Sequence, residues 1–161
     1  APYKVLEEWQ GEYDCNLKII LPDTYGSENF FKHAPDWLAK WTGVRIDSGD
    51  PIKGAETVLK WWTDKGEDTR SKLLIFSDGL DVNAIEMLYS KFASRARLSF
   101  GWGTMLTNDF RGLGVDLDSN PISLVCKAVS ANGCSTVKIS DDLGKSVGQV
   151  SDLNRYKRVF V

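Results

Sequence analysis

The sequence predicts an α/β fold built from successive strand-helix units with parallel strands. Four apolar, β-branched runs each end in a small polar cluster, namely LKIILPDTYG, GVRIDSGDP, KLLIFSDGLD and ARLSFGWGT. Helix-like stretches follow the first three runs, which favours parallel strand-helix units. In such folds ligands gather where the strands end. The candidate active-site face therefore comprises Asp23, residues 47–50, residues 78–81 and residues 101–104.

Composition limits the classes of function. The chain has 161 residues, 42% hydrophobic and 26% charged, which suits one domain of an ordinary globular fold. Its formal net charge is −2 without a long run of either sign, so we expect no nucleic-acid partner and no anionic membrane partner. The sequence lacks a spanning apolar segment, and its start does not resemble a signal peptide. We therefore expect a cytoplasmic protein.

The three cysteines argue against a disulfide framework. Cys15, Cys126 and Cys134 are an odd number, have no CxxC spacing and have no clustered histidines near them. We expect reduced, mostly buried thiols and no zinc site. Cys126 facing Cys134 across a hairpin is a less favoured alternative to plain packing.

The first elements follow from apolar spacing and from capping residues. Residues 2–11 have the pattern of a helix end, and residues 17–21 have strand composition. Ser27 can then cap a helix that runs to about Trp41, because aromatic residues recur at helical spacing and Gly43 follows. The tryptophans on such helix faces are expected to be core or interface residues.

The middle of the chain repeats the strand-helix rhythm. Pro51 suits the first turn of a helix, and Asp81 suits a helix N-cap. The expected elements are a strand at 44–46, a helix from Pro51 to about Gly66, a strand at 72–76, a helix at 84–92 and a strand at 97–100.

The pattern changes after residue 100. Residues 107–120 contain glycines and aspartates without a repeating apolar face, which indicates a loop. Two runs at 122–130 and 135–139 flank an Asn-Gly pair and predict an antiparallel hairpin. Residues 151–161 form at most a short basic amphipathic helix. We therefore divide the chain into strand-helix units at 1–120 and a hairpin with a C-terminal helix at 121–161.

The cluster after the second strand offers the richest chemistry. Asp47, Ser48 and Asp50 surround a glycine, and Arg45 lies on the same side of the strand as Asp47. Carboxylates accept from sugar hydroxyls or bind Mg²⁺, and arginine binds phosphate or carboxylate with two N–H groups. The alternative is a salt-bridged loop in which Asp50 and Pro51 only begin a helix.

Two further clusters carry carboxylates. Asp78 and Ser77 directly follow the third strand, and Asp78 has a better functional claim than Asp81, which suits a helix cap. Asp23 and Thr24 follow the first strand, where a simple turn is the alternative.

The glycine-spaced loop after the fourth strand could bind phosphate. Gly101 and Gly103 let the backbone approach a ligand, successive N–H groups can hold an anion, and Thr104 adds a hydroxyl. A tight turn is the alternative for this short motif. Trp102 between the glycines could project into solvent, stack on another ring or pack against the next helix.

Taken together, the motifs closely resemble the nicotinate phosphoribosyltransferase family. The matching blocks are DTYG, VRIDSGDP, FSDGLD, SFGWGTMLTND, PISLVCKAVSANG and KISDDLGK, in order over nearly the whole chain. The resemblance implies an enzyme of NAD salvage, with glycosyltransferase and ligase-type chemistry, that joins nicotinate to phosphoribosyl pyrophosphate with ATP assistance. It also implies Mg²⁺, an irregular TIM-like α/β barrel and a homodimer.

The resemblance also implies that this chain is the C-terminal part of such an enzyme, with the N-terminal half absent. The family's phosphorylated histidine has no match here, and His33, the one histidine, is expected to be a partly exposed helix residue. The isolated chain is therefore expected to be inactive.

The resemblance assigns roles residue by residue. Arg45 would face nicotinate and the reacting ribose, Asp47 and Asp50 would bind ribosyl hydroxyls or Mg²⁺-pyrophosphate, and Asp78 would contact sugar or phosphate. The substrate-binding set adds Asp23, Thr24, Ser48, Ser77, Gly101, Trp102, Gly103 and Thr104. Asp141 and Lys145 resemble part of a nucleotide-binding SDSPGK segment, although Asp142 and Leu143 replace its Ser-Pro pair.

Two other functions remain open on the sequence. One is a barrel phosphoribosyltransferase that acts on nicotinamide or quinolinate. The other is a half-barrel that binds phosphate without catalysis of its own.

Overall fold

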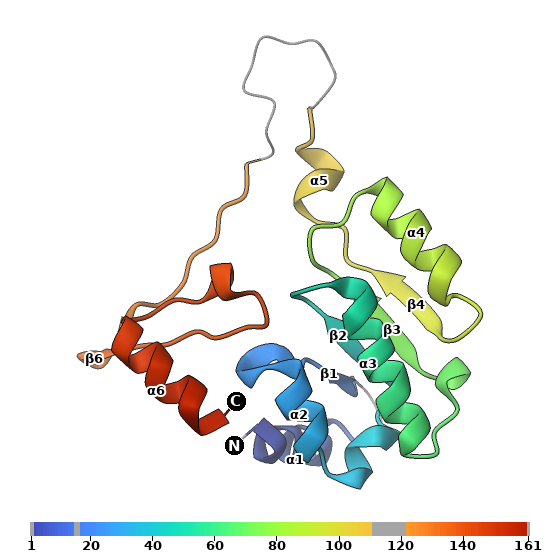
Figure 1. Cartoon of the computed structure of the whole chain (residues 1–161), viewed down its shortest axis with the longest axis horizontal. Coiled ribbons are helices and arrows are strands. Elements are labelled where there is room, and N and C mark those ends of the chain that lie inside the picture. The colour runs from blue at the N-terminus through green and yellow to red at the C-terminus, as the bar shows by residue number, and fades with distance from the viewer. Residues whose placement is uncertain (1, 15–16, 111–121, 161) are drawn as a thin grey trace.

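The computed structural model describes residues 2–14, 17–110 and 122–160. A four-stranded sheet in the order β1-β2-β3-β4 organises most of it (Figure 1), and all three strand pairs are parallel. The strands are β1 (Ile19–Ile20), β2 (Gly43–Ile46), β3 (Leu73–Phe76) and β4 (Arg97–Phe100). The predicted parallel strand-helix rhythm is therefore confirmed in the described residues.

Helices connect and cover these strands. The α-helices of this part are α1 (Pro2–Tyr13), α2 (Ser27–His33), α3 (Pro51–Asp64), α4 (Val82–Phe92) and α5 (Thr104–Thr107). Three 3₁₀ turns accompany them, η1 (Asp23–Tyr25), η2 (Asp36–Lys40) and η3 (Thr69–Ser71). Asp81 caps α4 as predicted, and Asp50 caps α3, which was the alternative to its functional role. The predicted Ser27 cap is wrong, because Gly26 occupies the N-cap position and Ser27 is the first residue of α2.

The two faces of the sheet differ in burial. Val44 and Ile46 of β2 and Leu74 and Phe76 of β3 are buried in the core with α3 and α4. On the opposite face, the Arg45 side chain is 43% exposed. This alternation follows from the period of two along a strand, and it leaves one face only partly covered.

Four of the tryptophans fulfil the predicted packing role, whereas Trp9 on α1 is 40% exposed. Trp41, Trp61 and Trp62 are buried in the same core, and Trp37 packs against it. The rings of Trp61 and Phe31 lie 4.9 Å apart, which joins α3 to α2.

The predicted continuous helix from Ser27 to Trp41 is wrong. Helix α2 ends at His33, Ala34 is extended, and η2 begins after Pro35. Proline has no N–H for the helical ladder and disfavours a helical residue before it, so the chain breaks there. His33 is exposed at the end of α2, as expected, and its Nδ1 lies 3.0 Å from the Asn29 carbonyl oxygen.

The hairpin exists but is shorter than predicted. It comprises β5 (Ser130–Ala131) and β6 (Cys134–Ser135), and Asn132 and Gly133 turn with φ of 50° and 76°. Residues 122–129 are exposed and have no strand partner in the described structure, so the longer predicted strand does not form. A second antiparallel bridge, not predicted, joins Lys138 to Val147.

The expectation of buried thiols is wrong for the two described cysteines. Cys126 and Cys134 are exposed and free. Cys15 lies outside the described residues, as does most of the predicted loop at 107–120 and with it the proposed boundary at residue 120.

The described chain ends with η4 (Leu143–Lys145) and helix α6 (Val150–Phe160), which confirms the predicted C-terminal helix. In Figure 1 helix α6 lies beside α2, on the β1 side of the sheet, and the hairpin lies farther out beyond α6. None of the helices formed by the described residues is both long and apolar enough to cross a membrane.

Candidate active site

Ser77 connects the second and third strand ends. Its Oγ accepts a hydrogen bond from Arg45 Nε at 2.8 Å and donates one to Asp47 Oδ1 at 2.8 Å. Arg45 Nη2 also pairs with the same carboxylate oxygen at 2.9 Å. The parallel register that places Ile46 beside Phe76 brings these residues together. A guanidinium and a carboxylate therefore hold fixed orientations at the strand ends.

Asp23 and Ser48 connect the first and second strand ends in the same way. The buried Ser48 donates its Oγ hydrogen to Asp23 Oδ2 at 2.6 Å. A buried hydroxyl needs such a partner, because an unsatisfied one is costly. The bond fixes the Asp23 carboxylate beside the loop that carries Asp47.

Asp50 caps a helix, which was the alternative to a role in ligand binding. Its Oδ1 accepts from Ile52 N at 2.8 Å and Lys53 N at 3.1 Å at the start of α3. This oxygen satisfies two N–H groups that the first helical turn cannot satisfy itself. Its predicted role toward ribose or Mg²⁺ stays a prediction.

The segment before α6 reaches back to the strand ends. Lys145 Nζ pairs with Asp78 Oδ1 at 2.6 Å and donates to the Asp47 carbonyl oxygen at 3.3 Å. Asp141 Oδ1 accepts from Ser27 N at 2.9 Å, and its Oδ2 accepts from Ser27 Oγ. Both residues thus have structural partners, and their predicted nucleotide-binding role stays a prediction.

The loop after β4 packs closely against Ser77. A Cβ at Gly101 would lie 3.1 Å from Ser77 Cβ, whereas a Cβ at Gly103 would meet nothing within 4 Å. A Cβ at position 101 would therefore press on Ser77, so the close approach favours glycine there. Thr104 begins α5 and is exposed, and the phosphate role of this loop stays a prediction.

Trp102 packs against the hydrophobic core and does not project into solvent, and its predicted substrate contact stays a prediction. It is half-buried, and its ring lies against the hydrophobic core. Its indole Nε1 is buried and has no hydrogen-bond partner in the described part of the chain.

The strand-end residues divide between cavities. Asp23, Thr24 and Asp47 line one of about 480 Å³, and Asp50 and Ser48 line another of about 350 Å³. Lys53 and Glu28 also lie in the second, where the hydrogen bond from Lys53 lowers the pKa of Glu28. Asp78 and Gly101 line neither of these two cavities.

The first cavity is also lined by residues of the C-terminal segment for which the sequence suggested no role at the site. These residues include Lys138, Asp152, Arg155 and Tyr156. The basic amphipathic pattern of residues 151–161 was the available signal, but nothing in the sequence placed that helix beside the strand ends.

A magnesium site formed by Asp47 together with Asp50 fits poorly. The two carboxylates line different cavities, and Asp50 already caps a helix. Within residues 2–14, 17–110 and 122–160, no group of three or more His, Cys, Asp or Glu side chains could hold a metal ion. Asp47 alone fits the usual Mg²⁺ arrangement of one or two carboxylates with substrate phosphates.

Comparison with known proteins agrees with this geometry. The family model for the nicotinate phosphoribosyltransferase (NAPRTase) family matches residues 2–161. The structure of nicotinate phosphoribosyltransferase from Vibrio cholerae superposes with a TM-score of 0.85 at 36% identity, covering 98% of this chain and 38% of that one. The structure of nicotinate phosphoribosyltransferase from Porphyromonas gingivalis superposes with a TM-score of 0.84 at 31% identity. The match covers 98% of this chain and 41% of that one.

A third similar structure comes from Saccharomyces cerevisiae, with a TM-score of 0.83, 30% identity, and coverage of 99% of this chain and 39% of that chain. The chain thus spans about two fifths of the solved structures it matches. Its strand order, its strand-end polar residues and its match over residues 2–161 lead to one conclusion: this chain belongs to the nicotinate phosphoribosyltransferase family.

Proposed function

We propose that the protein containing this chain transfers the phosphoribosyl group of phosphoribosyl pyrophosphate to nicotinate. The products are nicotinate mononucleotide and pyrophosphate, and the reaction belongs to NAD salvage with ATP as co-substrate. Family membership supports the reaction class. The observation that carries the proposal within the chain is the arrangement of Arg45, Ser77 and Asp47 at two adjacent strand ends.

The chemistry needs negative charge beside the anomeric carbon. Displacement of pyrophosphate passes through an oxocarbenium-like transition state, which a fixed carboxylate stabilises. Asp47 is fixed by Arg45 and Ser77, so it needs little reorganisation during the reaction. The nicotinate ring nitrogen is itself a nucleophile, so no general base is required, and Arg45 can attract the nicotinate carboxylate.

The neighbouring strand ends would hold the rest of the substrate. In the proposal, the loop from Gly101 to Thr104 binds the 5′-phosphate through backbone N–H groups, and Asp78 contacts sugar or phosphate. Mg²⁺, when present, would neutralise substrate phosphate charge and would contact Asp47 rather than the pair of Asp47 and Asp50.

The partly covered sheet face supports a larger barrel. Arg45 lies on the face opposite the buried core, and β1 and β4 are the two edges of the described sheet. In an irregular TIM-like barrel this face would point inward, and further strands would pair with both edges. We propose that barrel, and a homodimer, for the complete enzyme.

Product analysis tests the function. The full natural protein is incubated with phosphoribosyl pyrophosphate, Mg²⁺ and ATP and, in parallel, with nicotinate, nicotinamide or quinolinate. Formation of nicotinate mononucleotide is expected to be much faster than formation of either alternative product. A preference for nicotinamide or quinolinate would contradict the base assignment, and no product from any base would favour a binding protein without catalysis.

A further inference from the structure

Two parts of the chain hold the carboxylates at the strand ends. Serine hydroxyls from neighbouring strand ends donate to Asp23 and to Asp47. Asp78, which follows β3, pairs instead with Lys145 of the C-terminal segment. The orientation of this third carboxylate therefore depends on a residue that lies far from the sheet in the sequence.

The Lys145 amine joins two strand ends. Its Nζ lies 2.6 Å from Asp78 Oδ1 and donates to the Asp47 carbonyl oxygen at 3.3 Å. An ammonium group has three N–H donors and no acceptor, so it can hold both oxygens at once. The side chains of Lys145 and Asp78 are 35% and 37% exposed, so most of each is shielded from solvent. Solvent and salt screen such a pair less than a fully exposed one.

Hydrogen bonds within the turn fix the backbone that carries Lys145. The Asp142 carboxylate oxygen Oδ1 accepts from Gly144 N at 2.8 Å, which is a local side-chain turn. The Asp142 carbonyl oxygen accepts from Lys145 N at 3.1 Å and from the hydroxyl of the buried Ser140 at 2.9 Å. The amine of Lys145 therefore extends from an ordered turn.

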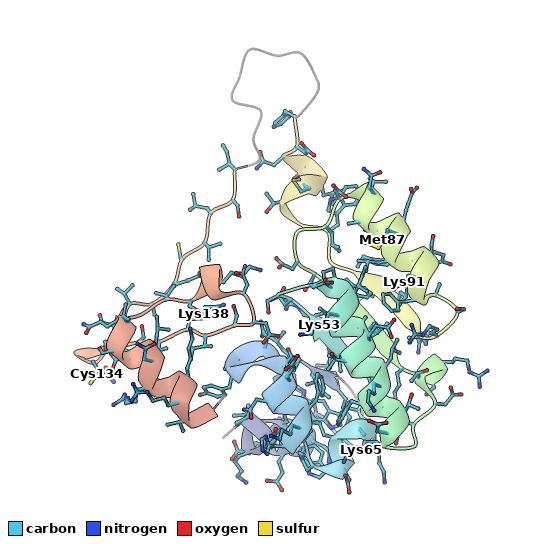
Figure 2. All side chains as sticks on the ribbon, in the orientation of Figure 1. Lys53, Lys65, Met87, Lys91, Cys134 and Lys138 are labelled. Carbon is cyan, nitrogen blue, oxygen red and sulfur yellow. The ribbon has the colours of Figure 1, made fainter. Side chains whose placement is uncertain are left out.

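The two sides of this turn are also tied to each other and to the preceding segment. Lys138, labelled in Figure 2 on the segment before the turn, exchanges backbone hydrogen bonds with Val147 at 2.8 and 3.0 Å. Lys127 Nζ donates to the carbonyl oxygen of Lys145 at 3.1 Å. These contacts hold Lys145 in place before any ligand binds.

A lysine at this position could bind phosphate directly or could orient Asp78, and the geometry favours orientation. The amine already has two protein acceptors, and a phosphate would have to displace it from the Asp78 carboxylate. Lys145 also lines neither the cavity of about 480 Å³ nor the cavity of about 350 Å³ at the strand ends.

We propose that Lys145 is a positioning residue, which orients the Asp78 carboxylate toward phosphoribosyl pyrophosphate and does not itself bind substrate or nucleotide. The inference rests on the proposed function, in which Asp78 contacts this substrate. Because Lys145 pairs with Oδ1, the second oxygen of Asp78 is held in one direction and can accept from the ligand.

A double-variant cycle tests whether Lys145 acts through Asp78. Titration calorimetry measures the Kd of phosphoribosyl pyrophosphate for the full natural protein with Lys145→Met, Asp78→Ala or both changes. Lys145→Met is expected to raise the Kd by about tenfold, the effect of losing one charged hydrogen bond. The double variant should bind like Asp78→Ala, because Lys145 has nothing to orient once the carboxylate is gone.

Two outcomes of the cycle would overturn the proposal. Losses that multiply in the double variant would show that Lys145 contributes independently of Asp78. A wild-type Kd in Lys145→Met or in Asp78→Ala would show that the pair does not serve binding. If urea denaturation shows that Lys145→Met is unfolded, Lys145→Gln takes its place in the cycle, because it removes the charge and keeps N–H donors.

Lys60 provides the matched control. Its Nζ also lies 2.6 Å from a carboxylate oxygen, that of Asp64, but the two side chains are 75% and 57% exposed on α3. Lys60→Met should leave the Kd unchanged, and an equal loss there would contradict a specific role of Lys145. Lys145→Arg keeps the positive charge and should recover part of the affinity.

Steady-state kinetics separate orientation of Asp78 from nucleotide binding. In Lys145→Met the KM for phosphoribosyl pyrophosphate should rise while the KM for ATP stays at the wild-type value. A general loss of structure would not spare one substrate. A raised KM for ATP alone would show that Lys145 binds the nucleotide and would overturn the proposal.

This proposal and the proposed function can fail separately. A protein that makes no nicotinate mononucleotide, yet binds phosphoribosyl pyrophosphate with the predicted coupling, would contradict the proposed function and support the role of Lys145. A protein that makes nicotinate mononucleotide, with a wild-type Kd in Lys145→Met, would contradict the role of Lys145 alone.

Discussion

The Asp141 carboxylate accepts a hydrogen bond from the backbone N–H of Ser27 at 2.9 Å, across 114 residues of sequence. It satisfies a donor at the start of α2 that the preceding Gly26 cannot satisfy with a side chain. Asp141 also lies against the loop after β2, because a Cβ at Gly49 would meet its Cβ at 3.6 Å. One carboxylate from the C-terminal segment therefore connects the loops after the first two strands.

Removal of this carboxylate should destabilise the fold measurably. Asp141→Ala is expected to lower the free energy of unfolding by about 1 to 2 kcal/mol, the range for loss of a helix cap. Ser27→Ala should cost less, since the backbone N–H keeps its acceptor. Urea denaturation of the single and double variants gives the coupling energy between the Ser27 hydroxyl and the Asp141 carboxylate, and strictly additive effects would show that these two side chains do not interact.

Two nearby glycines should respond differently to the same substitution. Gly101→Ala is expected to lower turnover strongly, because the new Cβ would lie 3.1 Å from Ser77 Cβ and shift the residue that orients Arg45 and Asp47. Gly103→Ala keeps its backbone N–H and places its Cβ in open space. Steady-state kinetics compare the two variants, and equal losses would show that close packing on Ser77 is not the cause.

One surface ion pair should make a small, pH-dependent contribution to stability. Arg95 donates to both Glu56 oxygens at 2.7 and 2.8 Å, and these hydrogen bonds lower the pKa of Glu56 below its ordinary value of 4.5. A lowered folded-state pKa stabilises the fold above pH 4.5, and this stability is lost as the pH falls through the folded value.

Glu56→Gln should therefore cost less than about 1 kcal/mol at pH 7, because both side chains are more than two fifths exposed and solvent screens the pair. The difference from wild type should shrink as the pH falls below 4.5. Glu86→Gln on α4 controls for removal of an exposed carboxylate. Thermal melts at several pH values measure both variants, and a difference that grows in acid would contradict the assignment.

The sequence predicted the elements whose signals are local. The helix at Pro51 combined a cap, a proline in the first turn and apolar spacing, and it forms as predicted. The helix after Ser27 is shorter than predicted. The aromatic spacing continues past Pro35, but the proline lacks the N–H that a helix needs, so the helix ends before it. The long strands predicted for the hairpin do not form. Strand formation depends on packing against neighbouring strands and side chains elsewhere in the fold, and composition does not reveal these.

Part of the candidate site was predictable, because it too depends on a local signal, the pattern of strands. Parallel strands place their carboxyl ends at one edge, so Asp23, Asp47 and Asp78 could be expected together from the strand pattern alone. The contacts of Asp141 with Ser27 and of Lys145 with Asp78 depend on how the C-terminal segment folds back. No local sequence pattern shows how the C-terminal segment folds back. The partners of Asp141 and Lys145, and the position of α6, could therefore be identified only from the structure.

The most direct test of the account is the rate of nicotinate mononucleotide formation by the full natural protein with Asp47→Asn. We predict a loss of turnover on the order of 10²-fold or more with an unchanged thermal melt, since one transition-state contact is lost while Arg45 and Ser77 keep the loop in place. Asp64→Asn, an exposed change on α3, is the matched control and should retain activity. Wild-type turnover in Asp47→Asn would contradict the central claim.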